Sequence, residues 1–242
     1  MRYAKNASQY DFPEYVGKPR WYCLASSPRT GSSLCAEYFE HTGLAGRPLE
    51  YFHPKYQEDF SSRWAFGDKK SYICLLERWR TSPNGVFGVK CHFDQFMDFQ
   101  TFVPENCRYL VIYHKNLLRQ AISYFKSLVS QQWTAFDKAA CQLREEDYDG
   151  QTLLQLVQYC QQLHKAWNVF LKQKALPSLS IAYEDLCLDR QAVLQKCADF
   201  LELDLSSAYA WQPSLKVQAD ELSEFYYRRL LKDVARVGLD LG

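Results

Sequence analysis

Short apolar runs separated by longer helical patterns dominate this chain. The runs are Trp21–Ala25, Val86–Cys91, Tyr109–Tyr113 and Leu179–Ala182, and none of them alternates strictly between apolar and polar residues. Strict alternation is typical of a strand that is exposed on one face, whereas a strand of a parallel sheet covered on both faces lacks it. The four runs therefore predict buried strands of a mostly parallel sheet.

Helical patterns fill the intervals between these runs. Apolar residues recur with helical spacing over Leu34–Phe39, Leu117–Leu128 and Leu153–Leu171. We expect the first helix to end at Gly43 and the last one at Pro177. Strands that alternate with helices predict an α/β protein with a three-layer αβα fold and right-handed crossovers.

The sequence shows no internal repeat and no linker rich in Pro, Gly or Ser. We therefore expect residues 1–242 to form a single domain. Residues 51–82 are aromatic and charged without strand signals. This segment predicts a helical insertion between the first two strands.

Composition narrows the possible classes of protein. The net charge is +1, so any affinity for phosphate has to be local, and no nucleic-acid partner is expected. Nine cysteines are spread singly without a CxxC motif, which indicates a reducing compartment and no disulfide framework. The five histidines lack metal-binding spacing, so no metal is expected. No signal-peptide or membrane-spanning pattern is visible, which favours a cytoplasmic protein.

The turn after the first run, SSPRTGSSL, combines the features of an anion site. Ligands of parallel sheets bind outside the carboxyl ends of the strands, where the following helix also directs its N-terminal N–H groups. Gly31 lets the backbone approach a ligand, and Arg29 adds a fixed charge. Hydroxyl groups come from Ser27, Thr30, Ser32 and Ser33. Together these residues predict a cradle for phosphate or sulfate.

Two alternatives bear on this cradle. Ser32 can act merely as a helix cap, but a cap does not account for Arg29, Thr30 and Gly31 together. The stretch also lacks the lysine of the GxxxxGK[ST] phosphate loop. This absence disfavours a magnesium-dependent kinase.

Two further stretches place polar residues after predicted strands. In YHKNLLRQAISYF, His114 and Lys115 follow the third run, and Ser123 lies further along the next helix. Such a set can hold a second phosphate group, although a solvated helix face produces the same pattern. In SIAYEDL, Tyr183 is either an ordinary strand end before helix-capping acids or a residue at the ligand edge, near an adenine.

These stretches, in this order, resemble the sulfotransferases that use 3′-phosphoadenosine 5′-phosphosulfate (PAPS). The resemblance is strongest to the bacterial trehalose 2-sulfotransferase type, through the blocks ASSPRTGSSLCAEYFEHTGLAGRPLEYF, SPNGVFGVKCHFDQ, RQAISYF and QADELSEFYYRRL. It implies a fold similar to that of P-loop NTPases and transfer of a sulfuryl group from PAPS to a hydroxyl of a carbohydrate or glycolipid. The product would be 3′-phosphoadenosine 5′-phosphate (PAP), no metal would be needed, and the protein would form homodimers.

The resemblance also implies roles on the donor side. Residues 29–33 would hold the 5′-phosphosulfate, and Ser123 would contact the 3′-phosphate. The family has an arginine before this helix, and either His114 or Lys115 stands in its place here. We favour Lys115 because a fixed cation suits a phosphate dianion better than a mostly neutral histidine. Lys216 and Gln218 would close over the nucleotide.

On the acceptor side, Glu50 in GRPLEYF matches the general base of this type. A carboxylate within hydrogen-bond reach can take the proton of an attacking hydroxyl. Lys90 would neutralise charge at the reacting centre. Further residues implied at the acceptor are Tyr51, Phe52, His92, Asp94 and Gln95, with His92 as a rival base. The aromatic residues after Glu50 are either a wall for stacking a sugar or part of the core.

Two rival functions stay open from the sequence alone. One is a nucleotide-dependent phosphotransferase, which the missing GK[ST] disfavours. The other is a non-catalytic nucleotide-binding module on the same fold. The replacement of the arginine by His114 or Lys115 keeps this second possibility open.

Overall fold

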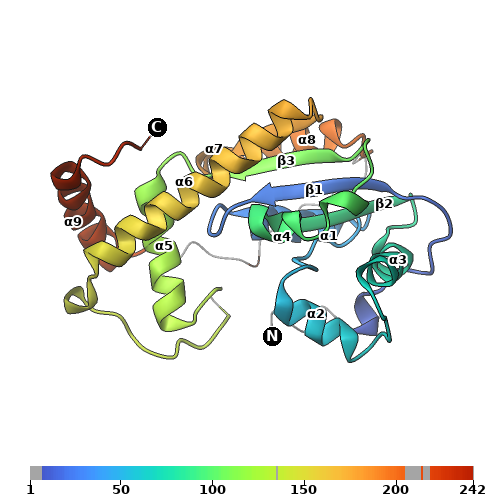
Figure 1. Cartoon of the computed structure of the whole chain (residues 1–242), viewed down its shortest axis with the longest axis horizontal. Coiled ribbons are helices and arrows are strands. Elements are labelled where there is room, and N and C mark those ends of the chain that lie inside the picture. The colour runs from blue at the N-terminus through green and yellow to red at the C-terminus, as the bar shows by residue number, and fades with distance from the viewer. Residues whose placement is uncertain (1–6, 135, 205–213, 215–218, 242) are drawn as a thin grey trace.

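A four-stranded parallel sheet forms the centre of the protein (Figure 1). The computed structural model describes residues 7–134, 136–204, 214 and 219–241. The strands are β1 (Arg20–Ser26), β2 (Val86–His92), β3 (Arg108–Tyr113) and β4 (Ser178–Ala182), in the order β2-β1-β3-β4. Each strand contains one of the predicted apolar runs, so the predicted parallel sheet is confirmed.

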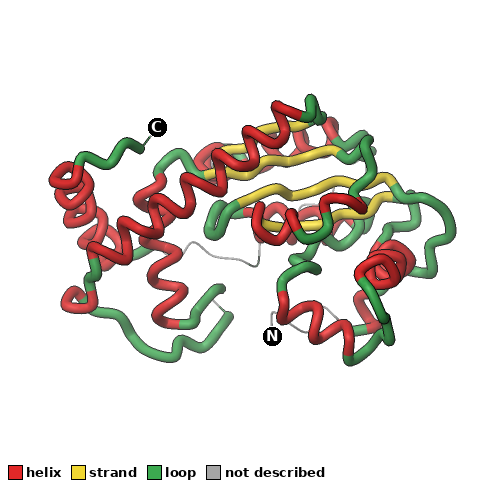
Figure 2. The backbone as a smooth tube through the Cα atoms, viewed as in Figure 1, coloured by secondary structure: helices red, strands yellow, loops and turns green. Residues whose placement is uncertain are grey.

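Helices cover both faces of this sheet (Figure 2). One face packs against α3 (Lys69–Arg80), α4 (Phe93–Met97) and the second half of α6 (Gly150–Gln173). The other face packs against α1 (Ser32–Thr42), α7 (Tyr183–Leu188) and α8 (Arg190–Phe200). Successive residues of a strand point to opposite sides, so helices on both faces bury nearly every residue of β1, β2 and β3. The three-layer αβα prediction is therefore confirmed.

A second group of helices lies beyond the carboxyl ends of the strands, at the left of Figure 1. It consists of α5 (Leu117–Ser130), the first half of α6 and α9 (Glu221–Val237), which share a separate apolar core. Helix α6 has 24 residues and spans about 36 Å, so it reaches from this group onto the sheet. Side chains of α5 and α6 consequently stand around the edge where ligands of such sheets bind.

Glycines at both ends define α1. Gly31 is its N-cap with φ 80°, and Gly43 is its C-cap with φ 66°, so the predicted stop at Gly43 is confirmed. Ser32 is the first helical residue, not the cap, and the N-cap makes no side-chain hydrogen bond. The alternative that Ser32 merely caps the helix is therefore wrong. A Cβ atom on Gly31 would lie 2.7 Å from the Tyr183 ring, so this ring packs directly against the turn.

Helix α6 ends four residues before Pro177, where the sequence predicted its end. Ala175 adopts the left-handed conformation with φ 50°. The N–H groups of Ala175 and Leu176 then bond back to the carbonyls of Lys172 and Leu171. This Schellman-like turn satisfies the last carbonyls of the helix without help from the proline.

Two helices occupy the segment 51–82, namely α2 (Pro54–Ser61) and α3. His53 caps α2, where Pro54 is the first helical residue, and Asp68 forms a capping box with Ser71 at the start of α3. Three short 3₁₀ turns complete the described structure, at Ser8–Tyr10, Gln100–Phe102 and Glu145–Asp147.

Candidate active site

The turn after β1 lies at the point where the sheet order reverses. β1 leads to β2 on one side, whereas β3 leads to β4 on the other, and such a switch point is the usual ligand site of an open parallel sheet. The Trp167 indole donates to the Ser26 carbonyl over 3.1 Å. The Gln120 side chain donates to Ser27 Oγ over 2.8 Å and to the Pro28 carbonyl over 2.6 Å. Helices α5 and α6 thus hold the turn in place.

Three of the predicted hydroxyl groups already have structural contacts, namely Ser27 and Thr30 within the turn and Ser33 at the start of α1. Thr30 is fully buried and donates to the Ser27 carbonyl over 3.1 Å, while Ser27 Oγ accepts from Gln120. Ser32 and Ser33 begin α1, whose positive end faces the same edge of the sheet. The N-terminal turn of α1 is therefore the part of the predicted cradle that is placed to meet an anion.

Arg29 connects the turn to α5. Its backbone adopts the left-handed conformation with φ 66°, which a residue with a side chain rarely takes. Arg29 Nε donates to Ser123 Oγ over 2.9 Å, and Nη1 donates to the Trp133 carbonyl over 2.6 Å. Strained backbone of this kind concentrates at functional sites. The structure thus brings together Arg29, which the sequence assigned to the 5′-phosphosulfate, and Ser123, which it assigned to the 3′-phosphate.

Glu50 and Lys90 form an ion pair beside the same turn. Lys90 Nζ lies 2.7 Å from Glu50 Oε1 and donates to Ser33 Oγ over 2.9 Å. The backbone brings Glu50 and Lys90 together. Leu49 forms an isolated parallel bridge with Val89, and the Leu49 carbonyl accepts a hydrogen bond from the Lys90 N–H over 3.0 Å. A segment remote from β2 in sequence is thereby attached to it, and Glu50 faces the start of α1.

His92 stands next to this pair. Its Nε2 lies 4.0 Å from Glu50 Oε2, and its Nδ1 lies 3.3 Å from the Ser26 carbonyl oxygen. Burial lowers the pKa of His92 below its ordinary value, although the Glu50 charge opposes this effect. The ring is therefore neutral at neutral pH. Nδ1 lies within 3.3 Å of the Ser26 carbonyl oxygen and 3.4 Å of the Ser26 hydroxyl, so Ser26 orients the ring beside Glu50.

The two predicted acceptor residues of α4 have different surroundings. The Gln95 side chain accepts from the His92 N–H over 3.1 Å at the start of the helix. Asp94 Oδ2 accepts from the Tyr159 hydroxyl of α6 over 3.3 Å. Gln95 therefore helps to terminate β2, and Asp94 is oriented by a residue that the sequence did not single out.

Tyr51 and Phe52 lie in the core beneath the site. They are 0% and 2% exposed. The Tyr51 hydroxyl donates to the Arg47 carbonyl, and the Phe52 ring stacks on Phe99 with 3.6 Å between the centroids. Their burial favours the core alternative over a wall for stacking a sugar.

The turn after β3 carries its own acidic partners. Glu184 lies 2.7 Å from His114 Nδ1 and accepts the backbone N–H groups of Lys115 and Asn116 over 3.0 and 3.2 Å. Lys115 Nζ lies 2.5 Å from Asp185. Burial lowers the pKa of His114, so a cation at this turn comes from Lys115 at neutral pH. Glu184 and Asp185 both belong to the YEDL stretch, where the sequence suggested them only as acids that cap a helix.

Lys216 and Gln218 lie outside the described residues. Four residues beside the site were missed by the sequence, namely Gln120, Trp133, Tyr159 and Glu184. Three of them belong to helices whose pattern already explained them, and Trp133 follows α5 in a stretch without a periodic signal.

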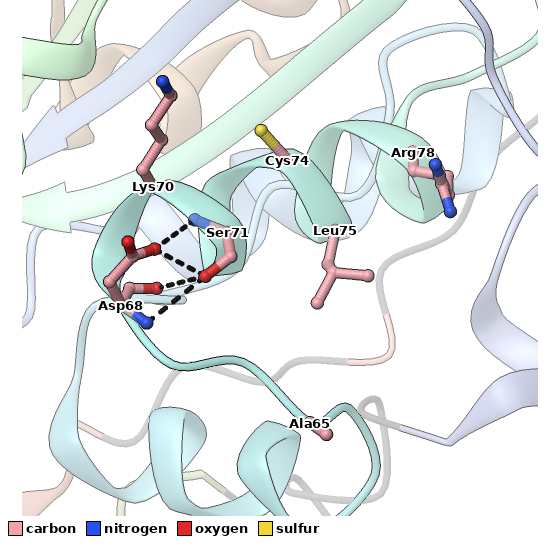
Figure 3. Close-up of a pocket in the computed structure, with 7 residues that line it drawn as sticks. All are labelled: Ala65, Asp68, Lys70, Ser71, Cys74, Leu75 and Arg78. Atoms are coloured by element: carbon pink, nitrogen blue, oxygen red, sulfur yellow. Dashed lines mark hydrogen bonds between the residues drawn. The ribbon is translucent and has the colours of Figure 1, made fainter.

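A hollow of about 490 Å³ lies on the outer side of α3, apart from these residues (Figure 3). It is lined by Ala65, Asp68, Lys70, Ser71, Cys74, Leu75 and Arg78, and the dashed lines in the figure mark the capping bonds between Asp68 and Ser71. None of the candidate site residues lines this hollow.

The described part of the chain carries neither a cluster of metal-binding side chains nor a membrane-spanning helix. Among residues 7–134, 136–204, 214 and 219–241, no three His, Cys, Asp or Glu side chains gather as a metal site would require. No helix within these ranges combines the length and apolarity needed to cross a bilayer.

Comparison with known proteins identifies the family. The model of the Stf0 sulphotransferase family matches residues 21–103 and 92–233, which together make up most of the chain. The protein therefore belongs to the Stf0 sulphotransferase family.

Two curated relatives match over almost the whole chain. The trehalose 2-sulfotransferase of Mycolicibacterium smegmatis is 22% identical, with 92% of this chain and 98% of the relative covered. The trehalose 2-sulfotransferase of Mycobacterium tuberculosis is 21% identical, with 91% and 97% covered. The resemblance to this type is thus confirmed.

A solved structure supports the fold. The sulfotransferase from Alicyclobacillus acidocaldarius superposes with a TM-score of 0.53 at 15% identity, covering 92% of this chain and 95% of that one. The predicted sulfotransferase fold is confirmed by this likeness together with the parallel sheet.

Proposed function

We propose that this sulfotransferase moves the sulfuryl group of PAPS to a hydroxyl of a carbohydrate or glycolipid acceptor, with Glu50 as general base. Family membership supports the reaction class, and the names of both curated relatives support a sugar acceptor, for which trehalose is the first candidate. PAPS is the sulfuryl donor that the sequence resemblance implies.

One observation carries the proposal, namely that Lys90 contacts both Glu50 and Ser33. The base therefore stands one side chain away from the turn that would hold the phosphosulfate. Glu50 would take the proton of the attacking hydroxyl. Lys90 would stabilise the negative charge that builds up on the oxygen leaving sulfur, as a fixed cation does in a site shielded from water.

The donor turn fits a nucleotide with two anionic groups. The start of α1 offers N–H groups to the 5′-phosphosulfate, and Gly31 leaves room where a Cβ atom would collide with Tyr183. The 2.9 Å contact between Arg29 and Ser123 brings the guanidinium close to the proposed 3′-phosphate site. We propose that Arg29 serves both groups, with Lys115 as the second cation.

Ligand-induced thermal stabilisation tests the donor. We expect PAP to raise the melting temperature because a ligand that binds only the folded state stabilises it by mass action. ATP with magnesium serves as the comparison. Stabilisation by ATP–magnesium alone would support a phosphotransferase and reject PAPS as the donor.

Transfer of ³⁵S from labelled PAPS to trehalose tests the reaction. We expect labelled sugar to form only when the protein, labelled PAPS and trehalose are all present. PAP binding without transfer to any member of a carbohydrate panel would support a non-catalytic nucleotide-binding module instead.

A further inference from the structure

Three half-buried aromatic side chains stand together between α5 and α6. Tyr124 lies on α5, Trp133 follows the end of that helix, and Tyr159 lies on α6. The Tyr124 ring centroid lies 6.0 Å from that of Trp133 and 6.3 Å from that of Tyr159. We call these three residues the ring wall. It is separate from the buried rings that follow Glu50 in sequence.

Two hydrogen bonds join the ring wall to the candidate active site. The Tyr159 hydroxyl donates to Asp94 Oδ2 over 3.3 Å, at the acceptor side. Arg29 Nη1 donates to the Trp133 carbonyl over 2.6 Å, at the donor side. The wall therefore reaches from the donor turn to α4.

Tyr124 lies close enough to both carboxylates of the site to sense their charge. Burial raises the pKa of its hydroxyl, and the charges of Asp94 and Glu50 raise it further. Within the described residues, neither the Tyr124 hydroxyl nor the Trp133 indole N–H has a hydrogen-bond partner. The wall thus combines apolar ring faces with two unpaired donors, and Tyr159 joins it to the Asp94 carboxylate.

This combination matches the two-sided chemistry of a sugar. A pyranose ring has C–H groups that pack on aromatic faces, and hydroxyl groups that donate to carboxylates. A sugar acid would bring a like charge toward Asp94 and Glu50. A phenol would stack on the rings but would offer no hydroxyl to Asp94 beyond the one that reacts.

We propose that the ring wall and Asp94 form the acceptor site and select a neutral, polyhydroxylated sugar ring. This inference rests on the proposed sulfuryl transfer. Asp94 accepts hydrogen bonds from the hydroxyls beside the attacking one, and Tyr159 holds its carboxylate in place. The ring wall supports the apolar face of the sugar, while Glu50 takes the proton.

Calorimetric binding of sugars to the complex with PAP tests this site directly. The probes are trehalose, methyl glucoside, methyl glucuronide and 4-nitrophenol. We expect the neutral sugars to bind and the other two to bind at least about 10-fold more weakly. Trp133→Leu and Asp94→Asn should each weaken sugar binding about 10-fold, and Tyr159→Phe about 3-fold.

PAP affinity and a control variant separate the possible outcomes. All three variants should keep the parent affinity for PAP, which also shows that they fold. Phe136→Leu changes an exposed ring of the same loop, 63% exposed, and should leave sugar binding unchanged. Parent-like sugar affinity in Trp133→Leu and Asp94→Asn, or tighter binding of the phenol or glucuronide, overturns the inference. A parent protein that binds no PAP instead overturns the proposed function.

Discussion

Lys90 Nζ lies 2.7 Å from Glu50 Oε1, and the two side chains are only 6% and 17% exposed. An ion pair that is shielded from water is stronger than one on the surface, and each partner fixes the position of the other. The same ammonium group donates to Ser33 at the start of α1. The pair therefore joins the proposed base to the proposed donor turn.

Replacing Lys90 tests its electrostatic role. Lys90→Met should lower kcat by about 100-fold or more, because the charge on the leaving oxygen loses its fixed cation. PAP affinity should change much less, which calorimetry can measure. The control Lys70→Met alters an exposed lysine of α3 and should retain parent activity. An unchanged kcat in Lys90→Met would exclude the lysine from catalysis.

Ser123 and Arg29 should be coupled in nucleotide binding. Ser123→Ala should weaken PAP about 3- to 10-fold but leave AMP unaffected, because only PAP carries the 3′-phosphate. Arg29→Ala should weaken both ligands, since Arg29 is proposed to serve both groups. The double variant should show non-additive losses, as expected for side chains in direct contact. Equal effects of Ser123→Ala on PAP and AMP would contradict its assignment.

Gly31→Ala should destabilise the protein through its backbone and through Tyr183. The position has φ 80°, and the new Cβ atom would lie 2.7 Å from the Tyr183 ring. The left-handed conformation alone costs roughly 1–2 kcal/mol for an alanine. For a chain of this size that cost corresponds to a fall in melting temperature of about 2–8 °C. Gly67→Ala is the control, because nothing lies within 4 Å of the place that its new Cβ atom would take. Equal melting temperatures for both variants would refute the close contact.

His164 should contribute to acid sensitivity. Burial lowers its pKa below 6.5, where its ring stacks on Tyr113. As pH falls from about 7 to about 5, the unfolded chain binds a proton that the folded protein resists, so the free energy of unfolding decreases. His164→Phe keeps the stacking surface and should flatten the fall in melting temperature over this range. A fall as steep as that of the parent would show that His164 titrates alike in both states.

Much of the fold could be predicted because its signals are local. Unbroken apolar runs gave the four strands, and Gly43 gave the end of α1. The order of the strands and the meeting of Glu50 with Lys90 depend on pairing between distant segments, such as the bridge from Leu49 to Val89. No periodic pattern in the sequence reports such a bridge.

The acceptor side was harder to predict than the donor turn. Tyr51 and Phe52 lie next to Glu50 in sequence, but their rings point into the core. Tyr159 lies on an amphipathic helix, where an aromatic residue has the same pattern whether it packs or binds. Glu184 resembled a helix cap, yet it reaches across to the turn after β3. Only the three-dimensional arrangement separates these roles.

Glu50→Gln provides the most direct test of the central claim, with sulfuryl transfer and PAP affinity measured on the same preparation. The amide keeps the shape of the side chain but cannot take a proton, so kcat should fall by about 100-fold or more while PAP binds as in the parent. Glu58→Gln, an exposed change on α2, is the matched control and should behave as the parent. Parent-like turnover in Glu50→Gln would contradict the assignment of Glu50 as the base.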